Sequence, residues 1–276
     1  MFEKTLIPVA YGERPEEVKK AGRLLKSLGA RSVCLYHVNE PGSFFSGADL
    51  SWLTLLSEEL EETGLVVEIK TGEGHIASTI AETALLEGVD GIYLKAKRRW
   101  HIETMLLGSI SQDLLRLADV PVFVHKARPR LSDDGTEPDS SDLRILYATD
   151  LDEASARLLP YVMEFQGAWC HVLHIRGRMA DPITERARRE AVDGELQAVA
   201  EELRPYYERV TIEARIGNPA SEVLHVSNQI EADIVALGRK SPAFLSAPMG
   251  AIAERIVIGS RASIFLVPQP GGRNAS

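Results

Sequence analysis

The chain contains the same plan twice, and this internal repeat constrains its fold more than any other feature. The segment 65–125 is followed about 143 residues later by a second segment with its glycine, aspartate and apolar positions in the same order. Gly72 corresponds to Gly217, and Asp90 corresponds to Asp233. Two copies at so long a period predict two globular domains rather than a solenoid of short repeats.

Length, composition and charge agree with two domains and exclude several classes of protein. The 276 residues suffice for two cores of ordinary size, and the 45% hydrophobic and 26% charged residues are typical of globular proteins. The net charge of −9 disfavours non-specific binding to nucleic acid. No apolar run approaches the ~18 residues that span a bilayer, and the first residues lead into a short strand rather than a signal peptide. We therefore expect a cytoplasmic protein that binds neither nucleic acid nor membrane.

Each half alternates short β-branched runs with longer segments of helical period, which predicts a parallel sheet covered by helices. In the first half we expect strands at 5–9, 32–37, 66–70, 91–94 and 122–125, and helices at 13–28, 50–63, 76–87 and 109–118. In the second half we expect strands at 144–148, 170–175, 209–214, 234–237 and 264–267, and helices at 153–165, 183–206, 220–230 and 251–258. The predicted fold class is α/β, with two tandem doubly wound, Rossmann-like parallel-sheet domains.

The segment 127–142 separates the two halves and differs from both in composition. It is rich in Asp, Ser, Pro and Gly and has no hydrophobic periodicity, so it cannot bury enough apolar surface to order itself. We expect a flexible acidic linker between a first domain at 1–126 and a second domain at 143–270.

The candidate binding site follows from the predicted topology. Doubly wound sheets bind ligands beyond the carboxyl ends of their strands, near a switch in strand order. The ends of the first, second and fourth strands and the start of the last helix should converge there. In the second repeat these segments contain Asp150, Ile175, Gly238, Arg239, Lys240, Ser241, Gly250 and Ala251. A helix N-terminus offers backbone N–H groups to phosphate, glycine lets an anion approach the backbone, and a carboxylate can accept hydrogen bonds from ribose or adenine. These are the parts of a nucleotide pocket.

Several segments of the second repeat resemble the universal stress protein family in its tandem two-domain form. They are the opening ILYATDLDEAS, the strand HVLHI, the segment IEADIVALGRKS and the helix MGAIAERIV. The resemblance covers nearly the whole chain apart from linker and tail, and it implies a fold like that of the adenine nucleotide alpha hydrolases. It also implies that the final strands pair between the two domains of one chain or between the subunits of a homodimer.

The resemblance implies which residues would hold a nucleotide. Nucleotide-binding members of the family hold ATP phosphates with a G-x2-G-x9-G-[S/T] pattern and carry an aspartate at the end of the first strand. The second repeat has Asp150 and Gly238, has Ser241 at the second glycine, and has Gly250-Ala251 at the final glycine and hydroxyl, with one residue fewer in between. The match is partial, because Ala251 lacks the hydroxyl.

The first repeat departs further from this pattern. Ala10 stands at the aspartate position, and Lys95 and Arg98 stand at the first two glycine positions, so that only Gly108 and the serine after it match. We expect that this copy has lost nucleotide binding, because both side chains would project into the phosphate volume. The basic stretch 95–101 can be a solvated loop, a patch for an anion or a partner, or a plug of its own pocket.

Histidine and cysteine residues on the second strands need separate consideration. His37 and His174 occupy equivalent strand ends, where each can lie beside an adenine ring or be a half-buried structural histidine, and we favour the structural interpretation. The cluster around Cys170, His171 and His174 does not predict a metal site, because neighbouring side chains of a strand point to opposite faces.

The sequence is therefore interpreted as that of a tandem universal-stress-like protein whose second domain binds an adenine nucleotide such as ATP or AMP. Whether Mg²⁺ binds together with the nucleotide is left open. It would act in the stress response by binding and signalling, with a protein partner left open. A nucleotide-independent scaffold and a slow adenine-nucleotide hydrolase are the alternatives. The sequence contains no P-loop and no G-x-S-x-G elbow, and it offers no identifiable base or arginine finger for hydrolysis of a nucleotide. We therefore predict weak ATPase activity at most.

Overall fold

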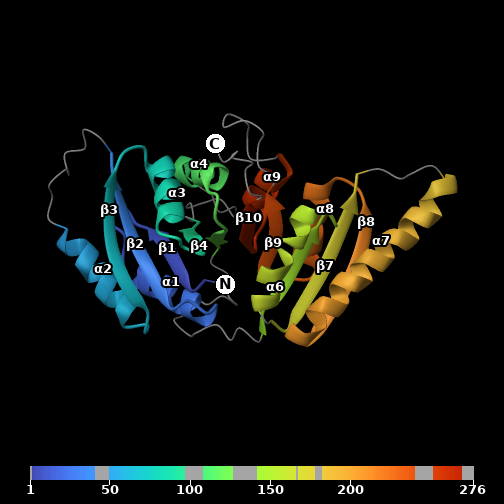
Figure 1. Cartoon of the computed structure of the whole chain (residues 1–276), viewed down its shortest axis with the longest axis horizontal. Coiled ribbons are helices and arrows are strands. Elements are labelled where there is room, and N and C mark those ends of the chain that lie inside the picture. The colour runs from blue at the N-terminus through green and yellow to red at the C-terminus, as the bar shows by residue number, and fades with distance from the viewer. Residues whose placement is uncertain are drawn as a thin grey trace. The chain divides into compact units, whose positions relative to one another are not determined.

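The computed structural model describes residues 2–40, 50–96, 108–126, 142–165, 167–177, 182–239 and 251–268. They form two compact units, one within the first 126 residues and one from residue 142 to residue 268 (Figure 1). The expected linker at 127–142 lies outside the described residues except for Asp142. Each unit is an α/β structure with a parallel sheet, which confirms the predicted fold class.

The first unit is a doubly wound sheet. Its strands are β1 (Lys4–Pro8), β2 (Ser32–Asn39), β3 (Val66–Glu73), β4 (Gly91–Lys95) and β5 (Val122–His125), and its helices are α1 (Pro15–Ser27), α2 (Ser51–Glu61), α3 (Ile76–Leu86) and α4 (Ser109–Leu117). The strands pair in parallel in the order β3-β2-β1-β4-β5. The switch in strand order therefore falls between β1 and β4. Right-handed crossovers place the packed pair α1 and α2 on one face and the packed pair α3 and α4 on the other.

The second unit repeats this topology. Its strands are β6 (Arg144–Thr149), β7 (Trp169–Arg176), β8 (Arg209–Ile216), β9 (Ile234–Arg239) and β10 (Ser263–Pro268), and its helices are α5 (Glu153–Ala156), α6 (Leu159–Phe165), α7 (Pro182–Leu203), α8 (Pro219–Gln229) and α9 (Ala251–Gly259). A 3₁₀ turn, Arg204–Tyr206, follows α7. The parallel order β8-β7-β6-β9-β10 places the switch between β6 and β9.

The repeated aspartates hold the start of each sheet. The amide of Lys4 donates to the carboxylate of Asp90 at 2.8 Å, and the amide of Asp90 donates back to the carbonyl of Lys4 at 2.8 Å. In the second unit the amide of Arg144 donates to the carboxylate of Asp233 at 2.9 Å, with the same return bond. Each aspartate thus joins the first strand to the turn before the fourth strand, which explains why both copies contain it.

Apolar strands form the core of each unit. Leu6, Leu35 and Ile92 have no exposed surface, and each such side chain contributes about 1.5–3 kcal/mol through burial. The buried rings of Phe123 and Phe265 lie at corresponding positions of the last strands. Parallel strands that are buried on both faces consist of continuous runs of apolar residues, and for this reason their positions could be predicted from the sequence.

The prediction of a single helix at 153–165 is wrong, because the structure contains two helices there. The first ends at Ala156 and the second begins at Leu159. Pro160 has no N–H for the carbonyl of Ala156, and its ring would collide with that carbonyl in one continuous helix. The break also presents the carbonyl of Ser155 to Tyr147, whose hydroxyl donates to it at 2.8 Å.

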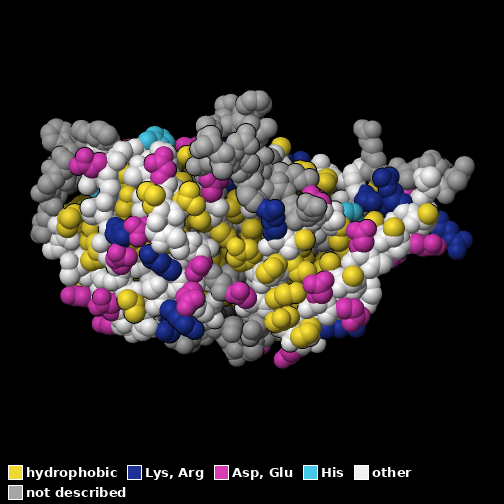
Figure 2. Space-filling view, in the orientation of Figure 1, with side chains coloured by type: hydrophobic (Ala, Val, Ile, Leu, Met, Phe, Trp, Pro, Cys, Tyr) yellow, Lys and Arg dark blue, Asp and Glu magenta, His cyan; other side chains and the backbone are white. Residues whose placement is uncertain are grey.

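The surface of the described residues is mixed in charge. Figure 2 shows acidic and basic side chains interspersed over the face in view, with basic side chains gathered near the start of α7, where Arg186, Arg188 and Arg189 occur. Among the described helices, none combines the length and the apolar character needed to cross a membrane.

Candidate functional site

A cavity of about 210 Å³ lies at the strand-order switch of the second unit. The cavity is lined by the ends of β6, β7 and β9, by the turn before α5 together with α5 itself, and by α8 and α9. The lining residues are Ala148, Thr149, Asp150, Asp152, Ser155, Leu173, Ile175, Pro219, Val223, Leu237, Gly238, Ala251, Ile252, Ala253 and Ile256. The four segments that the sequence predicted to converge therefore meet at one cavity.

The predicted site residues divide into three groups. Four of them line the cavity: Asp150, Ile175, Gly238 and Ala251. Arg239 is only 3% exposed and is not part of this lining, although it directly follows Gly238 on β9. Lys240, Ser241 and Gly250 lie outside the described residues.

The turn between β6 and α5 fixes the position of Asp150. The amide of Asp150 donates to the Ser155 hydroxyl at 2.9 Å, and the amide of Leu151 donates to the Thr149 hydroxyl at 3.0 Å. Asp152 caps α5 by accepting from the amide of Ser155 at 2.9 Å and from its hydroxyl at 3.0 Å. Leu151 adopts a φ of 58°, a left-handed conformation that costs about 1–2 kcal/mol in a non-glycine residue. Short side chains thus hold a strained turn with Asp150 at the rim of the cavity.

Gly238 leaves space beside the end of β9. A Cβ atom added there would meet no heavy atom of the described residues within 4 Å. As far as the described residues go, the backbone here has free space beside it, into which a ligand oxygen could come close to the main chain.

A second, polar hollow of about 390 Å³ also borders Asp150. It is lined by Asp150, Leu151, His174, Arg176, Gly177, Arg188, Val192 and Glu195. Arg176 forms an ion pair with Glu185 of α7 at 2.5 Å. Sequence analysis missed Arg188 and Glu195, because they lie in the middle of a long helix without a motif, and only packing brings them to the strand ends.

The two strand histidines have equivalent hydrogen bonds. Nδ1 of His37 donates to the carbonyl of Val9, and Nδ1 of His174 donates to the carbonyl of Thr149, both at 2.9 Å. Each ring therefore fastens the second strand to the end of the first strand, which supports the structural interpretation of both histidines.

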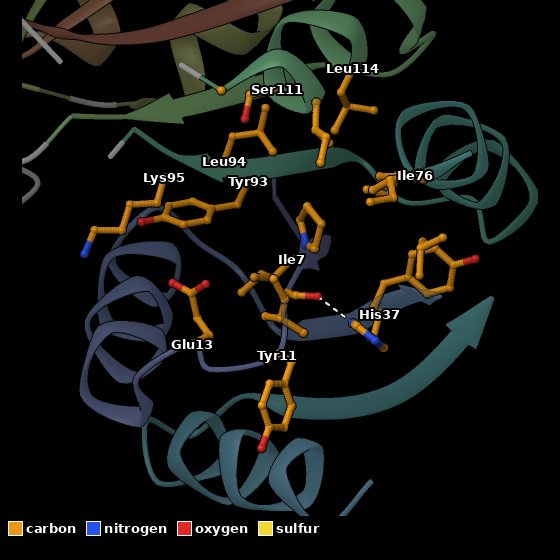
Figure 3. Close-up of a pocket in the computed structure, with 18 of the residues that line it drawn as sticks. Ile7, Tyr11, Glu13, His37, Ile76, Tyr93, Leu94, Lys95, Ser111 and Leu114 are labelled. Atoms are coloured by element: carbon orange, nitrogen blue, oxygen red, sulfur yellow. Dashed lines mark hydrogen bonds between the residues drawn. The ribbon is translucent and has the colours of Figure 1, made fainter. Parts of the chain in front are cut away.

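The first unit has a larger cavity at the equivalent place, about 450 Å³ in volume (Figure 3). Ala10 is exposed at its rim, where the second unit has Asp150. Lys95 lines this cavity and forms an ion pair with Glu17 of α1. Arg98 and the rest of the basic stretch lie outside the described residues. Lys95 thus reaches the predicted position, yet its pairing with α1 leaves the cavity open.

The described residues carry little sign of metal or thiol chemistry. They contain no group of three or more His, Cys, Asp or Glu residues that could hold a metal ion. Burial raises the pKa of the Cys34 thiol to about 11, and burial also raises the pKa of Cys170. Both cysteines are therefore protonated near neutral pH and act as small core residues.

The chain is similar to universal stress proteins along most of its length. The model of the universal stress protein family matches residues 1–126 and 143–268. A curated universal stress protein of Methanocaldococcus jannaschii is 24% identical over 157 residues, which cover 46% of this chain and 97% of that protein. The solved universal stress protein of Archaeoglobus fulgidus shares 19% identity at a TM-score of 0.71, with 97% of this chain and 98% of that chain covered. A putative universal stress protein of Pseudomonas aeruginosa shares 18% identity at a TM-score of 0.69, with 97% and 93% covered.

Proposed function

Because this chain belongs to the universal stress protein family, with two such domains in tandem, we propose that its second domain binds an adenine nucleotide. The protein would act in the stress response through this binding and through signalling rather than through turnover. The observation that carries the proposal is the meeting of Asp150, Ile175, Gly238 and Ala251 at one cavity, at the switch between β6 and β9.

The cavity suits the base and the ribose. Its walls at Leu173, Ile175 and Val223 are apolar, as a flat aromatic base requires. The Asp150 carboxylate at the rim would accept hydrogen bonds from the ribose hydroxyls or the adenine amino group. About 210 Å³ is smaller than the ~300–1,000 Å³ of common ligand sites, so the phosphates would extend beyond the described lining.

The phosphates would lie near Gly238 and the start of α9. The first turn of α9, from Ala251 onward, has backbone N–H groups without a partner inside the helix, and these groups favour anions. We assign the remaining phosphate contacts to Arg239, Lys240, Ser241 and Gly250. Mg²⁺ would accompany a triphosphate and would be held mainly by the phosphate oxygens.

Titration calorimetry of the full chain tests this proposal. We expect one ATP, ADP, AMP or cyclic nucleotide per chain. Asp150→Ala should weaken the affinity about tenfold to a hundredfold, because one charge-assisted hydrogen bond contributes about 1.5–3 kcal/mol. The matched control is Asp193→Ala, which removes an exposed carboxylate of α7 outside both hollows and should change nothing.

The outcomes separate the alternatives. Wild-type protein that binds no nucleotide would favour the nucleotide-independent scaffold. Unchanged affinity in Asp150→Ala with a collapsed melting temperature would make Asp150 structural. Product analysis after incubation with ATP distinguishes a binding protein from a slow hydrolase.

A further inference from the structure

We infer that the cavity of the first domain is a second ligand site with its own chemistry, and that it binds a small molecule with an aromatic ring and a protonated amine rather than a nucleotide. The two cavities occupy the same place in the same topology, but their linings differ in size, in aromatic content and in charge. These three differences carry the inference independently of the nucleotide proposed for the second domain.

Size is the first difference. The cavity of about 450 Å³ has more than twice the 210 Å³ of its counterpart and lies within the ~300–1,000 Å³ of common small-molecule sites. Its walls come from β1, β2, β4 and from all four helices of the unit. They are largely apolar, with Ile7, Val9, Val18, Val38, Ile76, Ile80, Leu94 and Leu114. A small, mainly apolar molecule would bury most of its surface there.

Aromatic side chains form one wall. The ring of Trp52 packs edge-on against His37, with centroids 5.0 Å apart and an interplanar angle of 87°. It packs in the same way against Tyr11, at 5.8 Å and 84°. His37 is itself fixed by its hydrogen bond to Val9. Such an ordered group of rings offers faces and edges to an aromatic ligand. The described lining of the second cavity contains no Phe, Tyr or Trp.

Charge is the third difference. The described lining contains three carboxylates, from Glu13, Glu17 and Glu40, and one ammonium group, from Lys95. That ammonium group is paired with Glu17. Figure 3 shows the Glu13 carboxylate on the side of the cavity near Lys95 and away from His37. The described part of the lining is therefore net negative, which repels a phosphate and attracts a protonated amine.

A matched pair of fluorescent probes tests the class of ligand on the full chain. 1-Naphthylmethylamine, which is protonated at neutral pH, and 1-naphthalenesulfonate share the naphthalene ring and differ in the sign of their charge. We expect saturable 1:1 binding of the amine, at least tenfold tighter than binding of the sulfonate. No saturable binding of the amine, or equal or tighter binding of the sulfonate, would overturn the inference.

Two tryptophan substitutions locate the site. Ala10 is exposed at the rim of the cavity, so Ala10→Trp should block the entrance without disturbing the core, and should weaken amine binding at least tenfold. Leu86→Trp adds the same ring at a position that is 83% exposed and outside the lining, and should leave binding unchanged. Equal effects of the two substitutions would overturn the location.

Two charge substitutions test the electrostatic argument without adding bulk. Glu17→Gln removes the partner of Lys95 and should tighten sulfonate binding at least threefold relative to amine binding. Glu16→Gln makes the same change at the exposed neighbouring position outside the lining and should leave this ratio unaltered. An unaltered ratio in both variants contradicts the role of charge.

ATP separates this site from the nucleotide site. The amine binding that Ala10→Trp removes should persist at saturating ATP and in Asp150→Ala, which acts on the second domain. Displacement of that binding by ATP would make this cavity a nucleotide site and overturn the inference, whereas failure of ATP to bind the second domain leaves the amine result intact.

Discussion

The two domains share their strand order and their paired aspartates but differ at the rim of the site. In the first domain the chain leaves β1 through Ala10 and Gly12, whose φ is +84°, and α1 begins without a side-chain cap. In the second domain it leaves β6 through Asp150, and Asp152 caps the next helix. Buried backbone pairing fixes the sheet, whereas the turns after its strands can change without loss of the fold. One scaffold thus presents two different rims, and this difference is the basis of the two ligand chemistries that we propose.

The largest expected effect tests whether the two domains are separate cores. Leu6 and Leu146 are fully buried and correspond in the registers of β1 and β6. Replacing either leucine with alanine should lower the free energy of unfolding by about 2–5 kcal/mol. Urea unfolding followed by hydrogen exchange should show that Leu6→Ala destabilises only residues of the first domain and Leu146→Ala only residues of the second. Equal effects on both domains would mean that they unfold as one unit.

The paired aspartates should differ in importance. Asp233 is 1% exposed, whereas Asp90 is exposed, although both accept a hydrogen bond from the first strand. Asp233→Ala leaves the part-buried amide of Arg144 without its acceptor and should lower the free energy of unfolding by about 1.5–3 kcal/mol. Asp90→Ala should lower it by less than about 1 kcal/mol, because water can replace the lost acceptor.

Denaturant midpoints of both variants measure this difference, and Asp233→Asn is the control because it keeps an acceptor oxygen. If the asparagine variant is as unstable as the alanine variant, the amide bond of Arg144 is not the cause.

The turns before the first helices should respond differently to loss of a side chain. Asp152→Ala removes the cap of α5 and should cost about 1 kcal/mol of stability. It should also weaken nucleotide binding several-fold, because Asp150 belongs to the same hydrogen-bonded turn. Arg14 stands at the start of α1 but makes no side-chain cap, so Arg14→Ala is the matched control and should change stability by only a few tenths of a kcal/mol. Thermal melts and calorimetry would contradict this if the two variants behaved alike.

Most of the fold could be predicted because it depends on local pattern. Buried parallel strands give continuous apolar runs, so the strand expected at 264–267 is observed as Ser263–Pro268. The place of the candidate cavity was predictable for a related reason: alternation of strands and helices implies a switch in strand order, where Asp150 follows β6 and Gly238 lies near the end of β9. The reason for the glycine at position 72 is not local, since a Cβ atom there would lie 2.1 Å from the hydroxyl of Tyr36 on the neighbouring strand β2.

What could not be predicted depends on contacts between distant segments. Lys95 lines the first cavity, but the pairing of its ammonium group with Glu17 could not be predicted, because Glu17 lies far away in the sequence on α1. The aromatic wall of that cavity unites Tyr11, His37 and Trp52 from three different segments. Single-sequence periodicity contains no signal for such pairings. The break in the helix after Ala156 differs from these cases, because it does have a signal in the sequence, namely Pro160. The helical period of the segment favoured one continuous helix in spite of that proline.

The smallest expected effect is a dependence of stability on pH that belongs to the second domain alone. Burial lowers the pKa of His171 below its usual value, although its partner Glu213, at 3.1 Å, opposes this shift. The folded domain therefore binds a proton at His171 less readily than the unfolded chain. Its contribution to stability is complete above the unfolded pKa of about 6.5 and is lost as the pH falls through the folded pKa.

The first domain has Cys34 at the corresponding position of β2, and the raised pKa of about 11 keeps that thiol neutral across this range. Thermal melts between pH 7 and pH 5 should thus show a loss of second-domain stability that His171→Gln reduces and that Cys34→Ser leaves unaltered. A wild-type and a His171→Gln protein with the same slope against pH would show that His171 does not distinguish the domains, and the difference between them would then rest on the rims of their cavities alone.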